Sequence, residues 1–323
     1  MQPYRSRDLR EFPRHNIISI ADQLVEYSPN LTNVKLRYVY RSHPAIVEAV
    51  SEAAYESYEG CNIAVETLTL ATTVTAEQRA KITNSYVPLA KKDYPIVLIN
   101  YPGESVILAN WSRCNKAQCD FTLSILRSIG TLVQNLTAAI TTYYSGDTDY
   151  LYAKMEDDKR NANLRLQYDY FHSIEITTVS AFIGGEADIN IIVTDVTGQR
   201  PNVPEEEENY QLEPPAFIFE DHIGTVAISR GIHAVIVVGD MDYLASEPGS
   251  VLTKFIQHAT TRAPILHGVI YQQMIQQCGP GRQMYDNKGY MRGLVNYPGR
   301  SIIARCEQNL NADWYATLGI RRI

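Results

Sequence analysis

The sequence contains no Gly-Lys dipeptide. A phosphate-binding loop of the Walker A type needs that pair within G-x-x-x-x-G-K-[ST], because its lysine reaches the outer phosphates and the next hydroxyl holds magnesium. No Asp-Glu pair follows an apolar run either, where such proteins place their magnesium carboxylates. The absence of both motifs excludes an ATPase that works autonomously with its own P-loop.

Cysteine is scarce, with five residues in 323. Cys114 and Cys119 lie close in sequence, but no second pair or histidine cluster joins them in the spacing of a zinc site. The sequence therefore predicts no metal site. Reduced thiols in a cytosolic or nuclear protein are the expectation from so few cysteines.

Long apolar runs and an excess of basic charge are also missing. No run has the length of a membrane span, and residues 1–15 are polar and arginine-rich without the apolar core of a secretory signal. The formal net charge of -7 argues against a surface coated in basic charge, although a local basic groove stays possible. With 45% hydrophobic and 20% charged residues, the composition is typical of a globular protein with no membrane partner.

Five short apolar runs are bounded by turn residues, as is typical of buried strands in a parallel sheet. These runs span 34–40, 94–101, 137–144, 189–196 and 234–240. Apolar residues recur at helical spacing after Pro44 and over 116–133. The alternation predicts a doubly wound α/β fold, with a parallel sheet flanked by helices.

The segment 197–215 interrupts this alternation with four prolines and a run of four glutamates. It predicts a solvated surface loop, with an acidic partner-binding loop as the alternative. Beyond about residue 263 the chain is rich in Gly, Tyr and Arg and weakly periodic.

Three stretches carry a resemblance to a known family. They are VYRSHP (39–44), VSAFIGGEADINIIV (179–193) and TVAISRGIHAVIVVGD (225–240). In this order they resemble Q-Y-R-M-H-P, V-D-x-F-Q-G-x-E-x-D-x-I-I and N-V-A-L-T-R-A-x-x-x-L-x-I-V-G. These are motifs of the second RecA-like domain of superfamily 1 helicases, most closely of the up-frameshift and senataxin-like group. The resemblance implies a RecA-like P-loop NTPase fold without a Walker A loop.

Weaker matches extend the resemblance to roughly Arg7–Gly239. They are RDLREFP (7–13), YESYEG (55–60), SRCNKAQC (112–119) and ITTYYSG (140–146). RDLREFP resembles the last motif of the first RecA-like domain, so the chain is expected to derive from a longer protein. The implied organisation is a remnant of the preceding domain and linker at 1–30, the helicase C-terminal domain at 31–262 with its acidic loop, and an extension at 263–323.

Helicases of this kind bind ATP with Mg²⁺ between two RecA-like domains. The first domain grips the phosphates, and the second supplies arginines that stabilise charge on the transferring phosphoryl group. The resemblance assigns that role to Arg41 and Arg230, whose guanidinium groups are planar, permanently charged and bidentate. It also implies that ATP would bind only with an N-terminal RecA-like domain supplied in cis or in trans.

The resemblance adds a nucleotide-facing backbone. Gly184 and Gly185 would let the chain approach the nucleotide. Glu186 would accept a hydrogen bond from the ribose or hold a nearby arginine, and Glu11 stands where the family has a nucleotide-facing glutamine. The open alternatives are that the glycines form only a tight strand entry and that Glu186 is a structural ion pair. Likewise, Arg41 could only anchor the turn before Ser-His-Pro, and Arg230 could cap or pair on the surface.

Three further residues would face single-stranded RNA or DNA. By resemblance, Thr141, Tyr143 and Thr178 lie toward the nucleic-acid channel, where hydroxyls and backbone amides contact phosphates without reading sequence. Purely structural roles for these three residues are the alternative. His43, beside Pro44, is expected to be structural.

Several polar positions of the family motifs are lost, whereas Arg41, Arg230 and Glu186 are retained. The substituted positions are Arg7, Glu11, Val39, Ser180, Ile183 and Thr225. This pattern predicts weakened catalysis or a partner that compensates. Two functions follow: the C-terminal motor domain of an ATP-dependent RNA or DNA helicase, inactive as this chain alone, or a non-catalytic, divergent module that binds RNA or protein.

Overall fold

The structure is a computed structural model that describes residues 39, 41–55, 94–130, 135–198, 216–246, 249–263 and 265–267. All of them belong to one of two compact units of the chain, Tyr38–Ile323; the other unit is Met1–Arg37. Among the residues just given, no helix combines the length and the apolar character that crossing a membrane requires.

A parallel sheet of six strands forms the centre of the described unit, in the order β5-β4-β6-β7-β1-β8. Every neighbouring pair in it runs parallel. The strands are β1 (Ile96–Asn100), β4 (Thr137–Thr142), β5 (Ser173–Thr178), β6 (Ala187–Val193), β7 (Gly231–Gly239) and β8 (Ile265–His267). A separate antiparallel hairpin pairs β2 (Val106–Ile107) with β3 (Arg113–Cys114).

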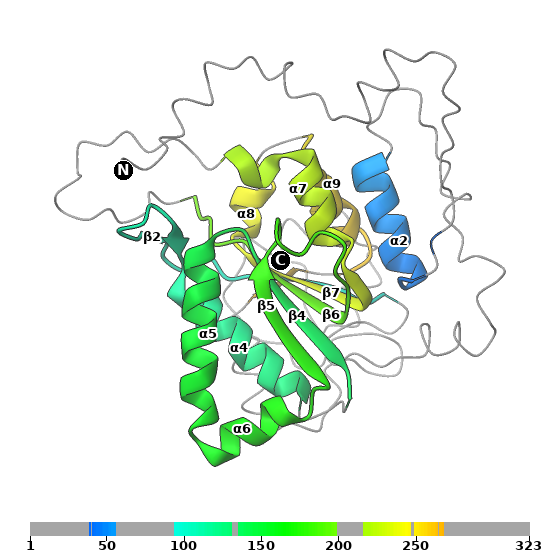
Figure 1. The fold of residues 1–323 in the computed structure, drawn as a ribbon. Helices are drawn as coiled ribbons and strands as arrows, with labels where there is room; N and C mark the ends of the chain where they lie inside the picture. The colour runs from blue at the N-terminus through cyan, green and yellow to red at the C-terminus, as the bar shows by residue number, and fades with distance from the viewer. Residues whose placement is uncertain are drawn as a thin grey trace, which may run out of the picture. The chain divides into compact units, whose positions relative to one another are not determined.

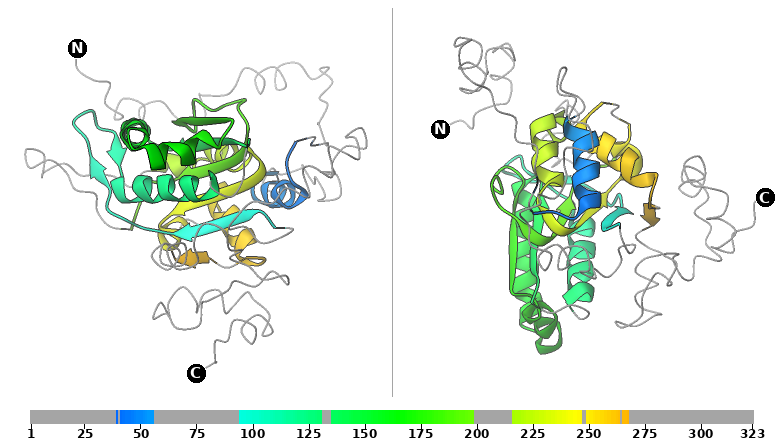
Figure 2. Two further views of the ribbon diagram at one scale, coloured as in Figure 1. Left: turned by 90° about the horizontal axis from the view of Figure 1, so that it is seen from below. Right: turned by 90° about the vertical axis from the view of Figure 1, so that its right-hand side faces the viewer.

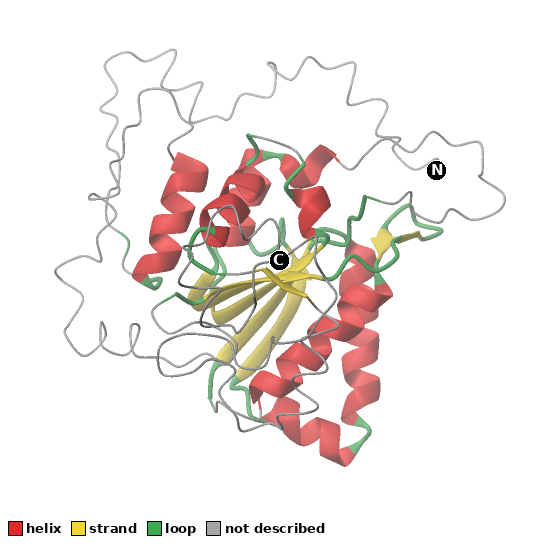
Figure 3. Cartoon of the chain, turned by 180° about the vertical axis from the view of Figure 1, so that it is seen from behind, coloured by secondary structure: helices red, strands yellow, loops and turns green. Residues whose placement is uncertain are grey.

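Helices cover both faces of this sheet (Figures 1 and 2). One layer contains α4 (Lys116–Gly130), α5 (Ser145–Lys159) and α6 (Ala162–Asp169). The other layer contains α2 (Pro44–Val50), its π-helical continuation η3 (Ser51–Tyr55), the 3-10 turn η6 (Ala216–Phe219), α7 (Asp221–Ile228), α8 (Met241–Leu244) and α9 (Val251–Thr260). Figure 3 shows the strands enclosed between the helices. The predicted α/β fold with a parallel sheet flanked by helices is confirmed.

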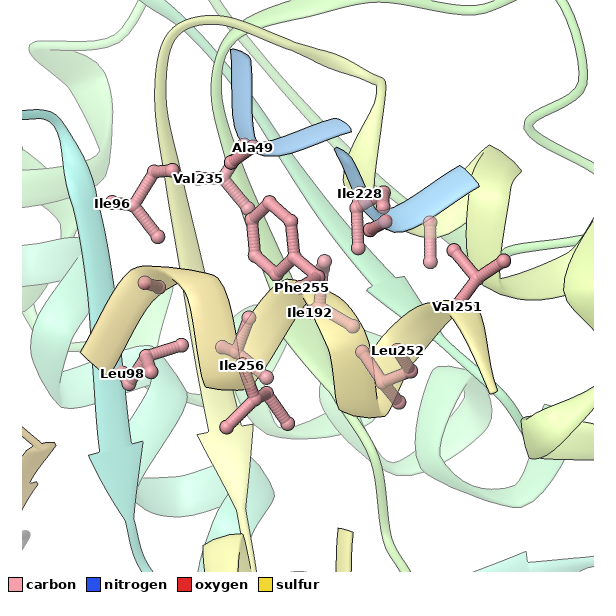
Figure 4. Close-up of a cluster of buried hydrophobic side chains, with 14 of the residues drawn as sticks. Ala49, Ile96, Leu98, Ile192, Ile228, Val235, Val251, Leu252, Phe255 and Ile256 are labelled. Carbon is pink, nitrogen blue, oxygen red and sulfur yellow. The ribbon is translucent and has the colours of Figure 1, made fainter. Parts of the chain in front are cut away.

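Alternate side chains of each central strand enter two separate cores. Val97 and Ile99 of β1 pack with α4 in one core, whereas Ile96 and Leu98 pack with Phe255 of α9 in the other. Figure 4 shows part of the second core. Because both faces of the strands are buried, their sequences are continuously apolar rather than alternating.

Four of the five predicted strands correspond to β1, β4, β6 and β7. Of the fifth, 34–40, the structure describes only Val39, in an isolated bridge. The sequence analysis does not predict β5, whose side chains are mostly exposed or half-buried. Nor does it predict β8, α5 or α6. Of the predicted loop 197–215, the structure describes only residues 197 and 198. Of the predicted extension 263–323, it describes only residues 263 and 265–267.

Strand order determines where the functional segments meet. The chain passes from β4 to β5 through α5 and α6 on one face, and from β6 to β7 through α7 on the other. The link between β5 and β6, residues 179–186, contains no helix and returns from the carboxyl end of the sheet to its amino end. This short return carries the Gly-Gly pair.

Candidate functional site

The Gly-Gly turn is a tight backbone structure at the entry to β6. The N–H of Phe182 donates to the carbonyl of Thr178, and that of Gly185 donates to the carbonyl of Phe182, both over 3.0 Å. Gly184 has a φ of +84°, and a Cβ on Gly185 would lie 2.4 Å from the ring of Phe182. The positive φ of Gly184 and the close approach of Gly185 to the Phe182 ring both favour glycine in the turn itself, which fits a tight strand entry without excluding a ligand.

A second loop is attached to the same end of the sheet. His43 caps α2, its Nδ1 accepting the N–H of Ala45 over 3.1 Å. The backbone N–H of His43 donates to the carbonyl of Ile232, at the start of β7, over 2.8 Å. The predicted structural role of His43 is thus confirmed. Its two hydrogen bonds hold Arg41 beside the amino ends of β6 and β7.

Arg41 contacts the Gly-Gly turn directly. Its Nη1 lies 2.8 Å from Oε2 of Glu186, and its Nη2 donates to the carbonyl of Ser229 over 3.0 Å. The two side chains are 30% and 52% exposed, respectively. An ion pair that is this exposed adds little to stability, so Arg41 can change partners at small cost.

Arg230 reaches the turn from the end of α7. Its Nε donates to the carbonyl of Val226 over 3.1 Å, and its Nη1 to the carbonyl of Gly185 over 3.3 Å. Its Nη2 lies 2.9 Å from the hydroxyl of Ser229. These three contacts fix the half-buried guanidinium group at the amino ends of β6 and β7.

The structure therefore brings five predicted residues together: Arg41, Gly184, Gly185, Glu186 and Arg230. Two permanent positive charges beside an open turn form a site suited to an anionic ligand such as a phosphate. Sequence reasoning missed Ser229, which both arginines contact. The signal was its place next to Arg230 within the same motif.

The predicted nucleic-acid residues lie at the opposite, carboxyl ends of the strands. Thr141 is fully buried and donates to Oδ1 of Asn190 over 3.1 Å. Tyr143 is buried against the ring of Phe217, with centroids 5.9 Å apart. Thr178 is half-buried, and its hydroxyl accepts the N–H of Ala181 over 3.3 Å. The first two side chains hold the fold, so Thr178 alone of the three presents side-chain surface. Glu11 lies outside the described residues.

Asp188 lies at the amino end of β6, two residues after Glu186, and fixes this end of the strand. Its Oδ2 accepts the N–H and the hydroxyl of Thr137 over 2.8 Å and 2.9 Å, and its Oδ1 lies 3.3 Å from Nε2 of His233. Burial by itself raises the pKa of Asp188, but the hydrogen bonds from His233 and Thr137 outweigh it and lower that pKa to about 2. The ionised carboxylate is thus the form that stabilises the fold.

We expect Asp188→Asn to lower the free energy of unfolding by about 2 kcal/mol at pH 7. Because the pKa in the folded state lies below its unfolded value, the stabilisation is present above about pH 4 and is lost as pH falls toward the folded value. Urea unfolding of both proteins at pH 7 and near pH 3 measures this difference. A gap between them that stays constant over this range would contradict the assignment.

Comparison with known proteins finds a family that covers most of the described residues. A family model described as an AAA domain matches residues 18–242, a range that contains every described member of the site and leaves out Glu11. The chain is also similar to the ATP-dependent helicase upf1 of Schizosaccharomyces pombe, with 23% identity over 260 residues. That alignment covers 79% of this chain and 24% of the relative, so the chain spans about a quarter of its length. The matched model is one found in UPF1- and senataxin-like helicases. Because this model matches more than half of the chain, the chain belongs to the AAA-domain family of the UPF1- and senataxin-like helicases.

Proposed function

We propose that this chain is the second RecA-like half of an ATP-dependent RNA or DNA helicase motor. Its partner is a RecA-like domain that carries the Walker A and B motifs, in cis or in trans. The observation that supports this is the meeting of Arg41 and Arg230, from segments far apart in the sequence, on Gly185 and Glu186. Such convergence suits arginine fingers better than isolated surface residues.

The two arginines would act on ATP with Mg²⁺ gripped by the partner domain. Phosphoryl transfer needs charge stabilisation more than covalent chemistry from the protein. Arg230 is held by three contacts, so it costs little reorganisation when charge develops on the phosphoryl oxygens. Arg41 leaves Glu186 for the phosphates, which frees that carboxylate for the ribose.

Nucleic acid would bind at the opposite ends of the strands. Thr178 and the backbone of the segment after it offer polar groups there for the phosphates of a single strand. Contacts of this type fix the path of a strand and do not read its sequence. The motor would therefore accept single-stranded RNA or DNA without base preference.

The purified chain by itself is expected to hydrolyse no ATP, with or without single-stranded RNA, because it has no lysine-bearing phosphate loop. Phosphate release should appear when the chain is fused behind, or mixed with, a Walker-type RecA-like domain from a Upf1-type helicase. Replacing the Walker lysine in that domain is the control. Turnover by the isolated chain, or none in any two-domain form, would refute the proposal.

A non-catalytic binding module is the second candidate, and Ile183 favours it. This side chain is 69% exposed at the tip of the Gly-Gly turn, where the family motif has a polar glutamine. An apolar group there weakens coupling to a nucleotide and suits a protein contact. Fluorescence anisotropy with labelled single-stranded RNA separates the two: a binding module holds RNA equally with and without nucleotide, whereas a motor half responds to nucleotide once its partner domain is present.

A further inference from the structure

Two buried thiols and a buried carboxylate meet at the carboxyl side of the sheet, far from the arginine site along the strands. Cys114 ends β3, Cys119 lies in the first turns of α4 and Asp147 lies in the first turn of α5. Their sulfur atoms and one carboxylate oxygen all lie within 4.8 Å of one another. The three residues, here called the Cys-Cys-Asp cluster, join three elements of the fold.

One atom of this cluster has no partner. Oδ1 of Asp147 accepts the N–H of Asn115 over 2.9 Å and lies 3.3 Å from Sγ of Cys119. Oδ2 of Asp147 makes no hydrogen bond, although the side chain is fully buried. A buried polar atom without a hydrogen bond destabilises the folded state. A cation bound by the two sulfur atoms and this carboxyl group would restore the balance.

A second buried carboxyl group, that of Asp195, interacts electrostatically with Asp147. Asp195 is fully buried, its Oδ2 accepts the hydroxyl of Ser105 over 2.9 Å and its Oδ1 has no hydrogen bond. Burial, and next the charge of Asp147, raise the pKa of Asp195 to about 8. The hydrogen bond from Ser105 and then the charge of Arg113 offset only part of this increase in pKa. Asp195 lies outside the group of mutually close ligand atoms, so we assign it no ligand role.

The spacing of the donor atoms fits a small tetrahedral ion. Zinc binds cysteine sulfur at about 2.3 Å and carboxylate oxygen at about 2.0–2.2 Å, so a tetrahedral site puts sulfur and oxygen about 3.6 Å apart. The observed distance from Cys119 Sγ to Asp147 Oδ1 is 3.3 Å. Two sulfurs with one oxygen also select thiophilic ions over magnesium or calcium.

We propose that Cys114, Cys119 and Asp147 bind one thiophilic divalent cation, with Zn²⁺ as the physiological ion. The site ties the β2–β3 hairpin to α4 and α5. All three side chains are buried, which favours a structural ion, and a fourth ligand such as water would complete the tetrahedron. This inference is independent of the proposed motor function, since the arginine site lies at the other ends of the strands.

Cobalt substitution tests the site on the full chain. Chain stripped with a chelator and kept reduced is titrated with Co²⁺ and then with Zn²⁺. We expect one equivalent of Co²⁺ to bind with the intense absorption of a cobalt–thiolate bond, Zn²⁺ to displace it, and the thermal midpoint to rise. Absence of cobalt–thiolate absorption in wild-type protein would overturn the proposal.

Variants locate the ion within the chain. Cys114→Ser, Cys119→Ser and Asp147→Asn should each abolish the absorption, whereas Cys278→Ser should retain it. Asp147→Asn keeps both thiols and nearly the same shape, and circular dichroism verifies its fold, so its loss of cobalt binding reports on the carboxylate. Unchanged cobalt binding in Asp147→Asn would overturn the proposal. A Cys114–Cys119 disulfide in freshly purified, metal-free protein, detected by mass spectrometry, would also overturn it, in favour of a redox pair.

Discussion

Replacing Arg230 with alanine is expected to lower ATP hydrolysis by about a thousandfold or more in a two-domain form of this protein, as loss of an arginine finger does elsewhere. Arg230 holds the carbonyls of Val226 and Gly185 as well as the hydroxyl of Ser229. In the proposed motor, its position is therefore set before a nucleotide binds. Under the proposed function, the replacement removes a positive charge that stabilises the transition state of phosphoryl transfer. The rate constant of hydrolysis should therefore fall far more than the affinity for ATP.

Matched variants distinguish this role from a general loss of charge. Arg230→Lys should recover only part of the rate, because an ammonium group is a point charge without the planar fork that makes the three contacts. Arg160→Ala should leave hydrolysis unchanged, since Arg160 is 81% exposed on the end of α5, where its ion pair joins it only to Asp157 three residues earlier. Single-turnover phosphate release, together with binding of a fluorescent ATP analogue, measures both quantities. An Arg230→Ala rate within a few-fold of wild type would remove the finger assignment.

The central sheet was predictable because its strands are buried on both faces. The runs that became β1, β6 and β7 are rich in Val, Ile and Leu, and the structure alternates these residues between two cores. The edge strand β5 was not predictable in the same way. Its sequence SIEITT mixes polar and apolar residues, and it pairs with β4 alone. Tertiary pairing, rather than local pattern, makes it a strand.

Helix α5 was not predicted because its sequence, like that of β5, lacks a clear apolar pattern. Its sequence SGDTDYLYAKMEDDK has few apolar positions, and the side chains it buries against the core are mainly Leu151 and Met155. The other buried positions in this helix include Gly146, Asp147 and Asp158, which are buried by neighbouring elements. A helix stabilised by a few contacts and by polar partners has no stripe that a sequence pattern can reveal.

Membership of the arginine site was predictable from motif order, but its pairing was not. The motifs assign Arg41, Arg230 and Glu186 to one site. Only the structure shows that Arg41 pairs with Glu186, whereas Arg230 donates to the carbonyl of Gly185. The Cys-Cys-Asp cluster shows the limit of spacing rules more clearly. Cys114 and Cys119 fit no metal motif in sequence, and Asp147 joins them only because α5 begins beside β3.

Truncating Phe255 to alanine is expected to lower the free energy of unfolding by about 3–5 kcal/mol. Phe255 is fully buried in α9, and Figure 4 shows its ring among Ala49 of α2, Ile192 of β6 and Val235 of β7. These neighbours come from three separate elements, two of them central strands, so they are expected to collapse little into the cavity left behind. The missing ring should therefore cost both its burial and its packing contacts.

Leu166→Ala on α6 is the control, since that side chain is 53% exposed and should cost less than about 0.5 kcal/mol. Phe255→Leu should fall between the two, because it refills part of the cavity. Urea unfolding of the three variants, with equal slopes required for comparison, gives the differences. A loss below about 1 kcal/mol for Phe255→Ala would mean that α9 packs loosely on α2. The loop that α2 anchors, with Arg41 at its end, would then lack the rigid support that an arginine finger requires.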